Sequence, residues 1–152
     1  MTHRVSVMRR VVLIVTILGL GVIAWIAFNR VRSLMMLGYV DSAIGRVRAV
    51  VGAEDQFART HPEVGYTCAL SRLPRDDQIA RLVKDGTDNG YAFNLVGCQL
   101  PKPKKPNLSY QVTARPLHSG LPAFCSDQSG IVRSDKDGSV ETCLVNGVPL
   151  GG

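Results

Sequence analysis

An apolar run without a single charge, Val11 to Phe28, constrains this chain more than any other feature. As a helix rising about 1.5 Å per residue, its 18 residues would span about 27 Å, close to the ~30 Å hydrocarbon core of a bilayer. No cluster of glycine and proline separates this run from an amphipathic segment that ends before His61-Pro62. The pattern predicts a membrane anchor that continues as a helical stalk.

This pattern divides the chain into four parts. We expect a cytoplasmic tail at 1–10, a transmembrane helix at 11–28, an amphipathic stalk helix at 29–61 and a small head at 62–152. The tail is basic and short, so the positive-inside tendency keeps it in the cytoplasm and places the head outside. A cleaved secretory signal is the alternative, but the run is long for a signal and its small-residue cleavage sites are poor.

The stalk segment has helical periodicity. Apolar residues recur at intervals of three, four or six on one side: Leu37, Val40, Ile44, Val47, Val51 and Phe57. Gly38, Gly45 and Gly52 repeat every seven residues, and each costs roughly 1 kcal/mol relative to alanine in a helix. Two interpretations stay open: a groove that another backbone or a sheet approaches closely, or points where the helix bends.

All four cysteines fall in the predicted head: Cys68, Cys98, Cys125 and Cys143. An even set in a small domain beyond a membrane segment predicts two disulfides in an oxidising compartment. Zinc is the competing use, but the spacing contains no Cys-x-x-Cys pair. Because these cysteines oxidise readily only outside the cytoplasm, they support an outward-facing head.

The head shows one helical pattern followed by strand patterns. Pro74 to Lys84 predicts a short helix with Ile79, Leu82 and Val83 inward, and we interpret Asp76-Asp77 as capping residues at its start. Extended segments follow at 91–98, 108–115, 123–126, 131–133 and 140–145, separated by turn signals. The predicted fold class is α+β, with the long helix packed by its apolar stripe on three to five antiparallel strands.

The net charge of +6 is unevenly distributed. Residues 1–61 hold eight arginines against three acidic residues, a net of +5, and residues 62–152 hold ten basic against nine acidic residues, a net of +1. A basic anchor region suits anionic lipid headgroups at least as well as nucleic acid, so we do not expect a nucleic-acid partner. Lys102, Lys104 and Lys105, with Tyr110 nearby, form a candidate polyanion contact, although lysines in a proline-rich loop more often form a solvated edge.

The sequence lacks the patterns that enzymes and cofactor-binding proteins use. His118 is the sole histidine of the head, and neither Ser119 nor Ser126 has a Gly-x-Ser-x-Gly setting. No glycine-rich phosphate loop occurs, so we expect neither catalysis nor a cofactor. Asp127, Asp135 and Asp137, with Glu141, are candidate calcium ligands, but their spacing is not that of an EF-hand and we interpret them as turn caps.

Four stretches resemble a group of bacterial pilin-like proteins related to type IV pilins and pseudopilins: Ala53 to Phe57, Pro62 to Leu70, Gly90 to Cys98 and Ala123 to Arg133. The resemblance extends from about Ser42 to Leu150. It implies a pilin-like head with Cys68 paired to Cys98 and Cys125 paired to Cys143, each bridge worth roughly 2 to 4 kcal/mol. It also implies a bacterial inner-membrane protein with a periplasmic head.

The amino terminus departs from the pilin pattern. Pilins usually carry a glycine before the apolar run and a glutamate five residues into it, whereas Arg10 precedes this run and no acidic residue occurs within it. The resemblance therefore implies the fold of the head but neither peptidase processing nor a pilus. We expect a structural accessory component of a type IV pilus or type II secretion apparatus, which contacts the bilayer and other subunits through the Gly38, Gly45 and Gly52 face. An anchored receptor for a polyanion or surface ligand is the alternative.

Overall fold

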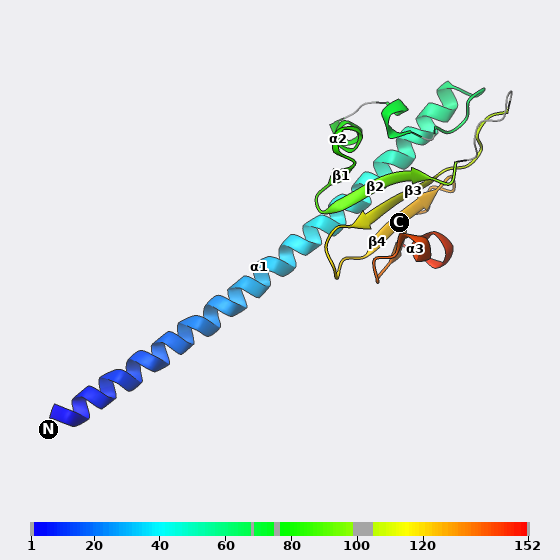
Figure 1. The fold of residues 1–152 in the computed structure, drawn as a ribbon. Helices are drawn as coiled ribbons and strands as arrows, with labels where there is room; N and C mark the ends of the chain where they lie inside the picture. The colour runs from blue at the N-terminus through cyan, green and yellow to red at the C-terminus, as the bar shows by residue number, and fades with distance from the viewer. Residues whose placement is uncertain (1, 68, 75–76, 99–104, 152) are drawn as a thin grey trace. The chain divides into compact units, whose positions relative to one another are not determined.

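The computed structural model describes residues 2–67, 69–74, 77–98 and 105–151, with no side chains described for 2–12 and 14. The chain forms two compact units, Met1–Leu37 and Gly38–Gly152, called the N-terminal unit and the C-terminal unit below. Helix α1, Thr2–Thr60, contributes residues to both units (Figure 1).

Helix α1 ends where the sequence predicts. The amide of His61 still donates to the carbonyl oxygen of Phe57 at 2.9 Å, and the two rings stack with their centroids 4.4 Å apart. Pro62 then disfavours the helical conformation at the residue before it, so the helix cannot continue. The predicted stop at His61-Pro62 is confirmed.

The C-terminal unit is built on a sheet of six antiparallel strands that follow one another in sequence order. The strands are β1 Thr87–Asp88, β2 Tyr91–Val96, β3 Gln111–Pro116, β4 Ala123–Asp127, β5 Arg133–Asp135 and β6 Val148–Pro149. The predicted α+β class is confirmed. The described strands are more numerous than the predicted three to five, because β1 and β6 are two-residue strands at the sheet edges, too short to show alternation.

The two faces of the sheet meet different helices. Cys125 is bonded to Cys143 of α3, Val140–Asn146, so its side of the sheet faces α3. Alternation along the strands places the other side toward residues 38–60 of α1 (Figure 1). The buried side chains of that layer are Ala43, Val47, Val50, Phe57, Tyr91, Phe93, Val112, Ala114 and Phe124.

The apolar face of α1 is centred on Val47 and Val50, both fully buried. Each contributes roughly 1.5–3 kcal/mol relative to an exposed side chain. The prediction that the stalk's apolar stripe packs on the sheet is confirmed for Val47 and Phe57, and Val40, Ile44 and Val51 are half-buried. It is wrong for Leu37, which is 60% exposed.

The short helix α2, Asp77–Asp85, confirms most of the pattern predicted for Pro74 to Lys84. Ile79 and Leu82 are buried, and Gly86 ends the helix in the left-handed region, its amide donating to the carbonyl of Leu82 at 2.9 Å. Arg75 and Asp76 lie outside the described residues, so the structure does not place the predicted Asp76 cap.

Strand β3 begins three residues later than predicted. Asn107 pairs instead with the chain that follows α1: its amide donates to the carbonyl of Val64 at 2.8 Å, and its carbonyl accepts from the amide of Tyr66 at 2.9 Å. Residues 108–110 lie between this pairing and β3, and they do not join the ladder with β2. The segments predicted at 91–98 and 108–115 pair as antiparallel neighbours, with Val96 opposite Gln111.

The extended segment predicted at 140–145 is wrong, because these residues form α3. The side chain of Ser139 caps the helix by accepting from the amide of Thr142 at 3.1 Å, and Glu141 lies in the first turn. Val140 and Cys143 are its buried residues, three apart as one helix face requires. The bond from Cys143 to Cys125 holds this short helix on the sheet.

Candidate functional site

The N-terminal unit exposes the side chains that the sequence assigns to a membrane anchor. Of the described residues, Leu20, Trp25 and Leu34 are each more than 65% exposed, and nothing in the unit covers them. By length and composition, α1 is the one helix in the described part of the chain that is able to cross a membrane. None of the residues in its most apolar stretch is buried. It can serve as a membrane span or as a signal anchor.

Gly38, Gly45 and Gly52 lie on the solvent side of α1 within the C-terminal unit. A Cβ atom added at any of them would meet no described atom within 4 Å. The interpretation that the sheet approaches the helix at these glycines is therefore wrong, because the sheet packs on the Val47 and Val50 side instead. Helix α1 is continuous through all three, which leaves an open strip of low side-chain volume.

The structure confirms one predicted disulfide. Cys125 and Cys143 are bonded, with their Cα atoms 6.0 Å apart. Cys68 lies outside the described residues, so its pairing with Cys98 stays a prediction; no described cysteine is free. The Sγ atom of Cys98 lies 3.8 Å from the carbonyl oxygen of Thr67, the residue before Cys68.

The candidate calcium ligands are engaged in local hydrogen bonds. Asp127 accepts from the amide of Ser129 at 2.8 Å and pairs with Arg133 at 3.0 Å, contacts that hold its pKa below the usual range despite partial burial. Asp135 accepts from the amide of Ser139 at 2.8 Å, and Asp137 is exposed in the turn that follows. Within the described ranges, no cluster of three metal-ligating side chains forms.

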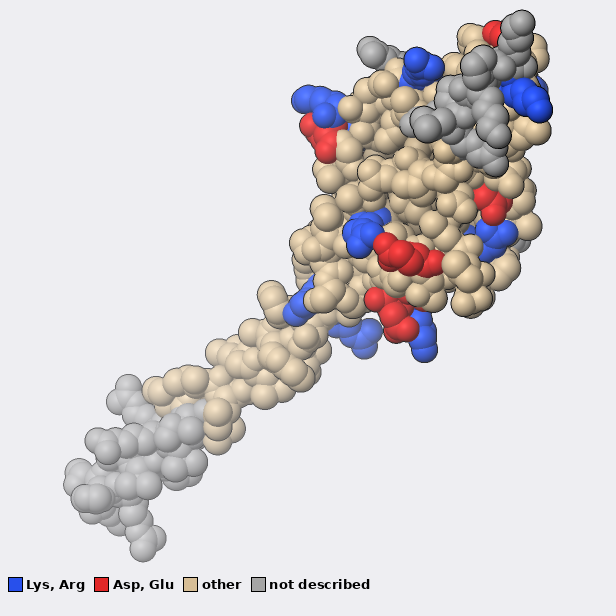
Figure 2. Space-filling view, turned by 45° about the vertical axis from the view of Figure 1, so that its right-hand side comes forward, with Lys and Arg blue, Asp and Glu red and all other residues tan. Residues whose placement is uncertain are grey.

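The candidate polyanion contact is only partly described. Lys102 and Lys104 lie outside the described residues, and Lys105 is exposed. Tyr110 is fully buried, so the idea that it assists these lysines at the surface is wrong. On the face shown in Figure 2, basic and acidic side chains of the C-terminal unit are interspersed rather than gathered by sign.

The candidate catalytic residues do not assemble. His118 is exposed in the loop between β3 and β4, where its ring lies 6.3 Å from that of Tyr39. Ser126 is buried and donates to the carbonyl of Ile131 at 3.0 Å, and Ser119 is exposed.

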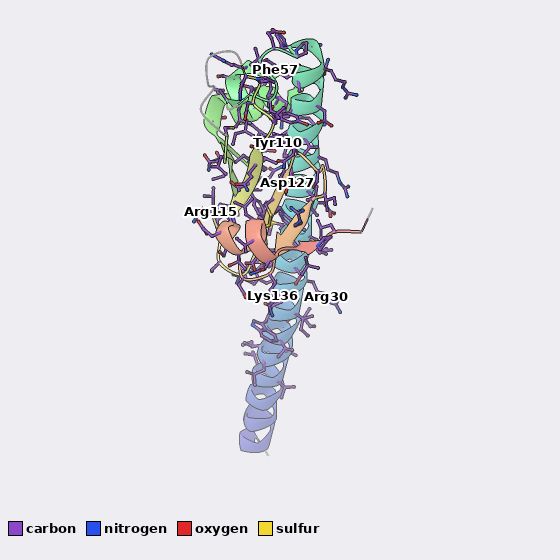
Figure 3. The ribbon with its side chains drawn as sticks, turned by 90° about the vertical axis from the view of Figure 1, so that its right-hand side faces the viewer. Arg30, Phe57, Tyr110, Arg115, Asp127 and Lys136 are labelled. Atoms are coloured by element: carbon purple, nitrogen blue, oxygen red, sulfur yellow. A yellow bond between two sulfur atoms is a disulfide. The ribbon has the colours of Figure 1, made fainter. Side chains whose placement is uncertain are left out.

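A buried polar cluster that the sequence analysis did not predict lies near the end of α1. Glu54 is fully buried, and its Oε2 atom accepts from the amide of Thr67 at 2.9 Å. Its Oε1 atom has no hydrogen-bond partner among the described residues. The Tyr110 hydroxyl is also buried with no partner in the described part of the chain, and the centroid of the Tyr110 ring lies 4.8 Å from that of Tyr66. Figure 3 shows Tyr110 between Phe57 and Asp127 along the C-terminal unit.

Burial dominates the electrostatics of this cluster. Burial is the main reason why the pKa of Glu54 is raised from 4.5 to about 7. The negative charge of Asp55 also raises this pKa, and the hydrogen bond from the Thr67 amide lowers it. Burial also raises the pKa of Tyr110 above its ordinary value of 10.0, with the negative charges of Asp55 and Glu54 adding to the effect. Tyr110 is therefore neutral at pH 7, whereas Glu54 changes its charge near that pH.

The sequence contains a signal for the burial of Glu54. Positions 43, 47, 50, 54 and 57 follow helical spacing of three and four, so a glutamate falls on the buried face. The apolar stripe predicted from the sequence includes Val51 instead of Val50, and Val51 is only half-buried, beside Gly130. A stripe drawn through Val51 does not include Glu54.

No protein-family model, curated protein or solved structure matches this chain. The residues and their geometry therefore carry the functional argument.

Proposed function

We propose that this chain is a membrane-anchored, pilin-like structural component that acts beside a type IV pilus or type II secretion apparatus without catalysing a reaction. The apolar part of α1 would sit in the bacterial inner membrane, with the amino terminus in the cytoplasm and the C-terminal unit in the periplasm. The exposed strip at Gly38, Gly45 and Gly52 would then contact helices of neighbouring subunits.

One observation carries the proposal: a single helix supplies both an uncovered apolar surface and a core face. Apolar side chains such as Leu20 are exposed in the N-terminal unit, whereas Val47 and Val50 are fully buried in the C-terminal unit. An exposed apolar surface of this size is stable in lipid rather than in water. The architecture of helix plus antiparallel sheet agrees with the pilin-like resemblance of the sequence.

The glycine strip supports lateral contact with another helix. Small residues let backbones approach closely, and in membrane-proximal helices they are frequent at helix–helix contacts. Because residues seven apart advance nearly two full turns, the three glycines remain on one side of α1. Within the chain that side is unused, since no described atom comes within 4 Å of an added Cβ.

Photo-crosslinking in a native bacterial host tests this function. Arg48 is exposed and lies three residues after Gly45, so a crosslinking side chain there reports on the strip. We expect Arg48 to yield covalent adducts with other membrane-anchored subunits. The control is Gln128, which is exposed in the turn after β4 and should give few adducts.

The outcomes separate the proposal from the receptor alternative. A free-standing receptor predicts no subunit adducts from Arg48, and salt-sensitive retention on a polyanion instead. If neither position crosslinks to an anchored subunit, the structural role beside a pilus or secretion apparatus is wrong.

A further inference from the structure

The polar cluster near the end of α1 contains a carboxyl group in an unusual setting. Glu54 is fully buried and faces the segment that returns from α1 toward the sheet. A buried carboxylate normally needs a cation or several hydrogen bonds, since its desolvation is costly. Among the described residues no cation pairs with Glu54, and the amide of Thr67 is the one donor that reaches it.

We propose that Glu54 is a proton-binding site in the core, whose neutral form fastens the chain at Thr67 to α1 and whose charged form loosens it. A neutral carboxyl group can remain buried with the single hydrogen bond to Thr67 at 2.9 Å. Its Oε1 atom, which has no hydrogen-bond partner among the described residues, then carries no uncompensated charge.

Burial favours the neutral form of Glu54 most strongly, and the hydrogen bond from Thr67 favours the charged form. On α1, Asp55 raises the pKa of Glu54 by charge repulsion. From the segment after α1, Tyr66 presents a phenol whose own pKa is raised by burial, and Tyr110, the residue before β3, presents another. The negative charge of Asp127 on β4 adds to the rise in the pKa of Tyr110. The positive charge of Arg59, which is exposed on the last turn of α1, lowers the pKa of Tyr66.

Loss of the proton has a defined structural consequence. A charge at Glu54 is trapped beside apolar neighbours on α1, such as Val50 and Phe57, and it gains stability by reaching water. The Thr67 amide anchors the segment through Glu54, so the segment separates from α1 more often once the carboxyl is charged. This site lies away from the glycine strip, and the inference does not depend on the proposed function.

Infrared titration of the full-length protein in phospholipid nanodiscs tests the site directly. The carbonyl stretch of a protonated carboxylic acid should persist above pH 6 and vanish with a midpoint near 7, and Glu54→Gln should remove it. A wild-type protein in which every carboxyl titrates below pH 5 overturns the proposal. This measurement on the wild type remains decisive even if Glu54→Gln fails to fold.

A second variant and a second readout distinguish proton binding from mere burial. Asp55→Asn removes the nearby negative charge, so the midpoint should move to lower pH. Amide exchange at Tyr66 and Thr67, corrected for its intrinsic pH dependence, should accelerate on the order of tenfold between pH 6 and pH 8. The proposal is also wrong if exchange there is pH-independent, or if Glu54→Gln retains the same pH dependence.

Discussion

Residues on either side of Leu37 belong to the same helix but have opposite surroundings. In the N-terminal unit the large apolar side chains of α1 are exposed, whereas in the C-terminal unit Val47 and Val50 are covered completely. Valine occurs on both sides, so composition alone does not explain the contrast. What differs is periodicity: apolar residues surround the first part of the helix and form one face of the second.

The largest expected effect comes from a charge in the covered part. Val47→Asp places a carboxylate in the core without a partner, and we expect a loss of more than about 4 kcal/mol, enough to unfold the C-terminal unit. Near-UV circular dichroism in detergent would record the loss. Retention of native stability would show that α1 does not pack on the sheet.

The same substitution in the uncovered part should act on a different property. Val22 is 56% exposed, so Val22→Asp should leave the melting of the C-terminal unit unchanged. Near the centre of a membrane helix it should instead cost about 3 kcal/mol of insertion free energy. Carbonate extraction of membranes measures this effect, with Val22→Leu as control, and unchanged retention would contradict a membrane span.

The disulfide sharpens the comparison because it belongs to the C-terminal unit alone. Cys143→Ser opens a link between residues 18 apart, and we expect the free energy of unfolding to fall by about 3 kcal/mol. Cys125→Ser should match it, and the double variant should add little. Denaturant unfolding provides the measurement, and additive losses would indicate that the two cysteines act separately.

The buried glutamate predicts an uncommon pH dependence. Because the pKa of Glu54 rises from 4.5 to about 7 on folding, the folded state holds a proton over that range that the unfolded state has released. The stability from this group is therefore complete below pH 4.5 and is lost as the pH rises toward 7, by as much as about 3 kcal/mol. Chemical unfolding from pH 4.5 to 8 should show this slope in the wild type and not in Glu54→Gln.

The smallest effect is expected on the glycine strip. Gly45→Ala meets no described atom within 4 Å and removes a residue that weakens helices, so it should stabilise the C-terminal unit by up to about 1 kcal/mol. The same substitution should reduce crosslinking from Arg48 if another helix packs there. A destabilised monomer would indicate that the chain itself uses this side of α1.

The sequence predicted the elements whose signals are local. The proline after His61 and the alternation of β2 each act within a few residues, and each has the expected effect. The segment 140–145 was predicted wrongly because its six residues are compatible with both the strand period of 2 and the helical period of 3.6. The Ser139 cap and the disulfide to Cys125 stabilise the helix.

The buried cluster needed information that no local pattern carries. Glu54, Thr67 and Tyr110 are far apart in the sequence, and their proximity follows from how the segment after α1 pairs with Asn107. The glycine repeat was visible in the sequence, but the side on which the sheet lies was not. Only the register of α1 against the sheet shows that these glycines face outward.

Trp25 offers the most direct test of a helix with two environments. It is the single tryptophan of the chain and is 68% exposed, so its fluorescence reports on whatever covers α1 from outside. In phospholipid vesicles we expect blue-shifted emission that brominated acyl chains quench and aqueous iodide does not. Emission typical of water, quenched by iodide and insensitive to brominated lipid, would contradict the membrane placement of α1.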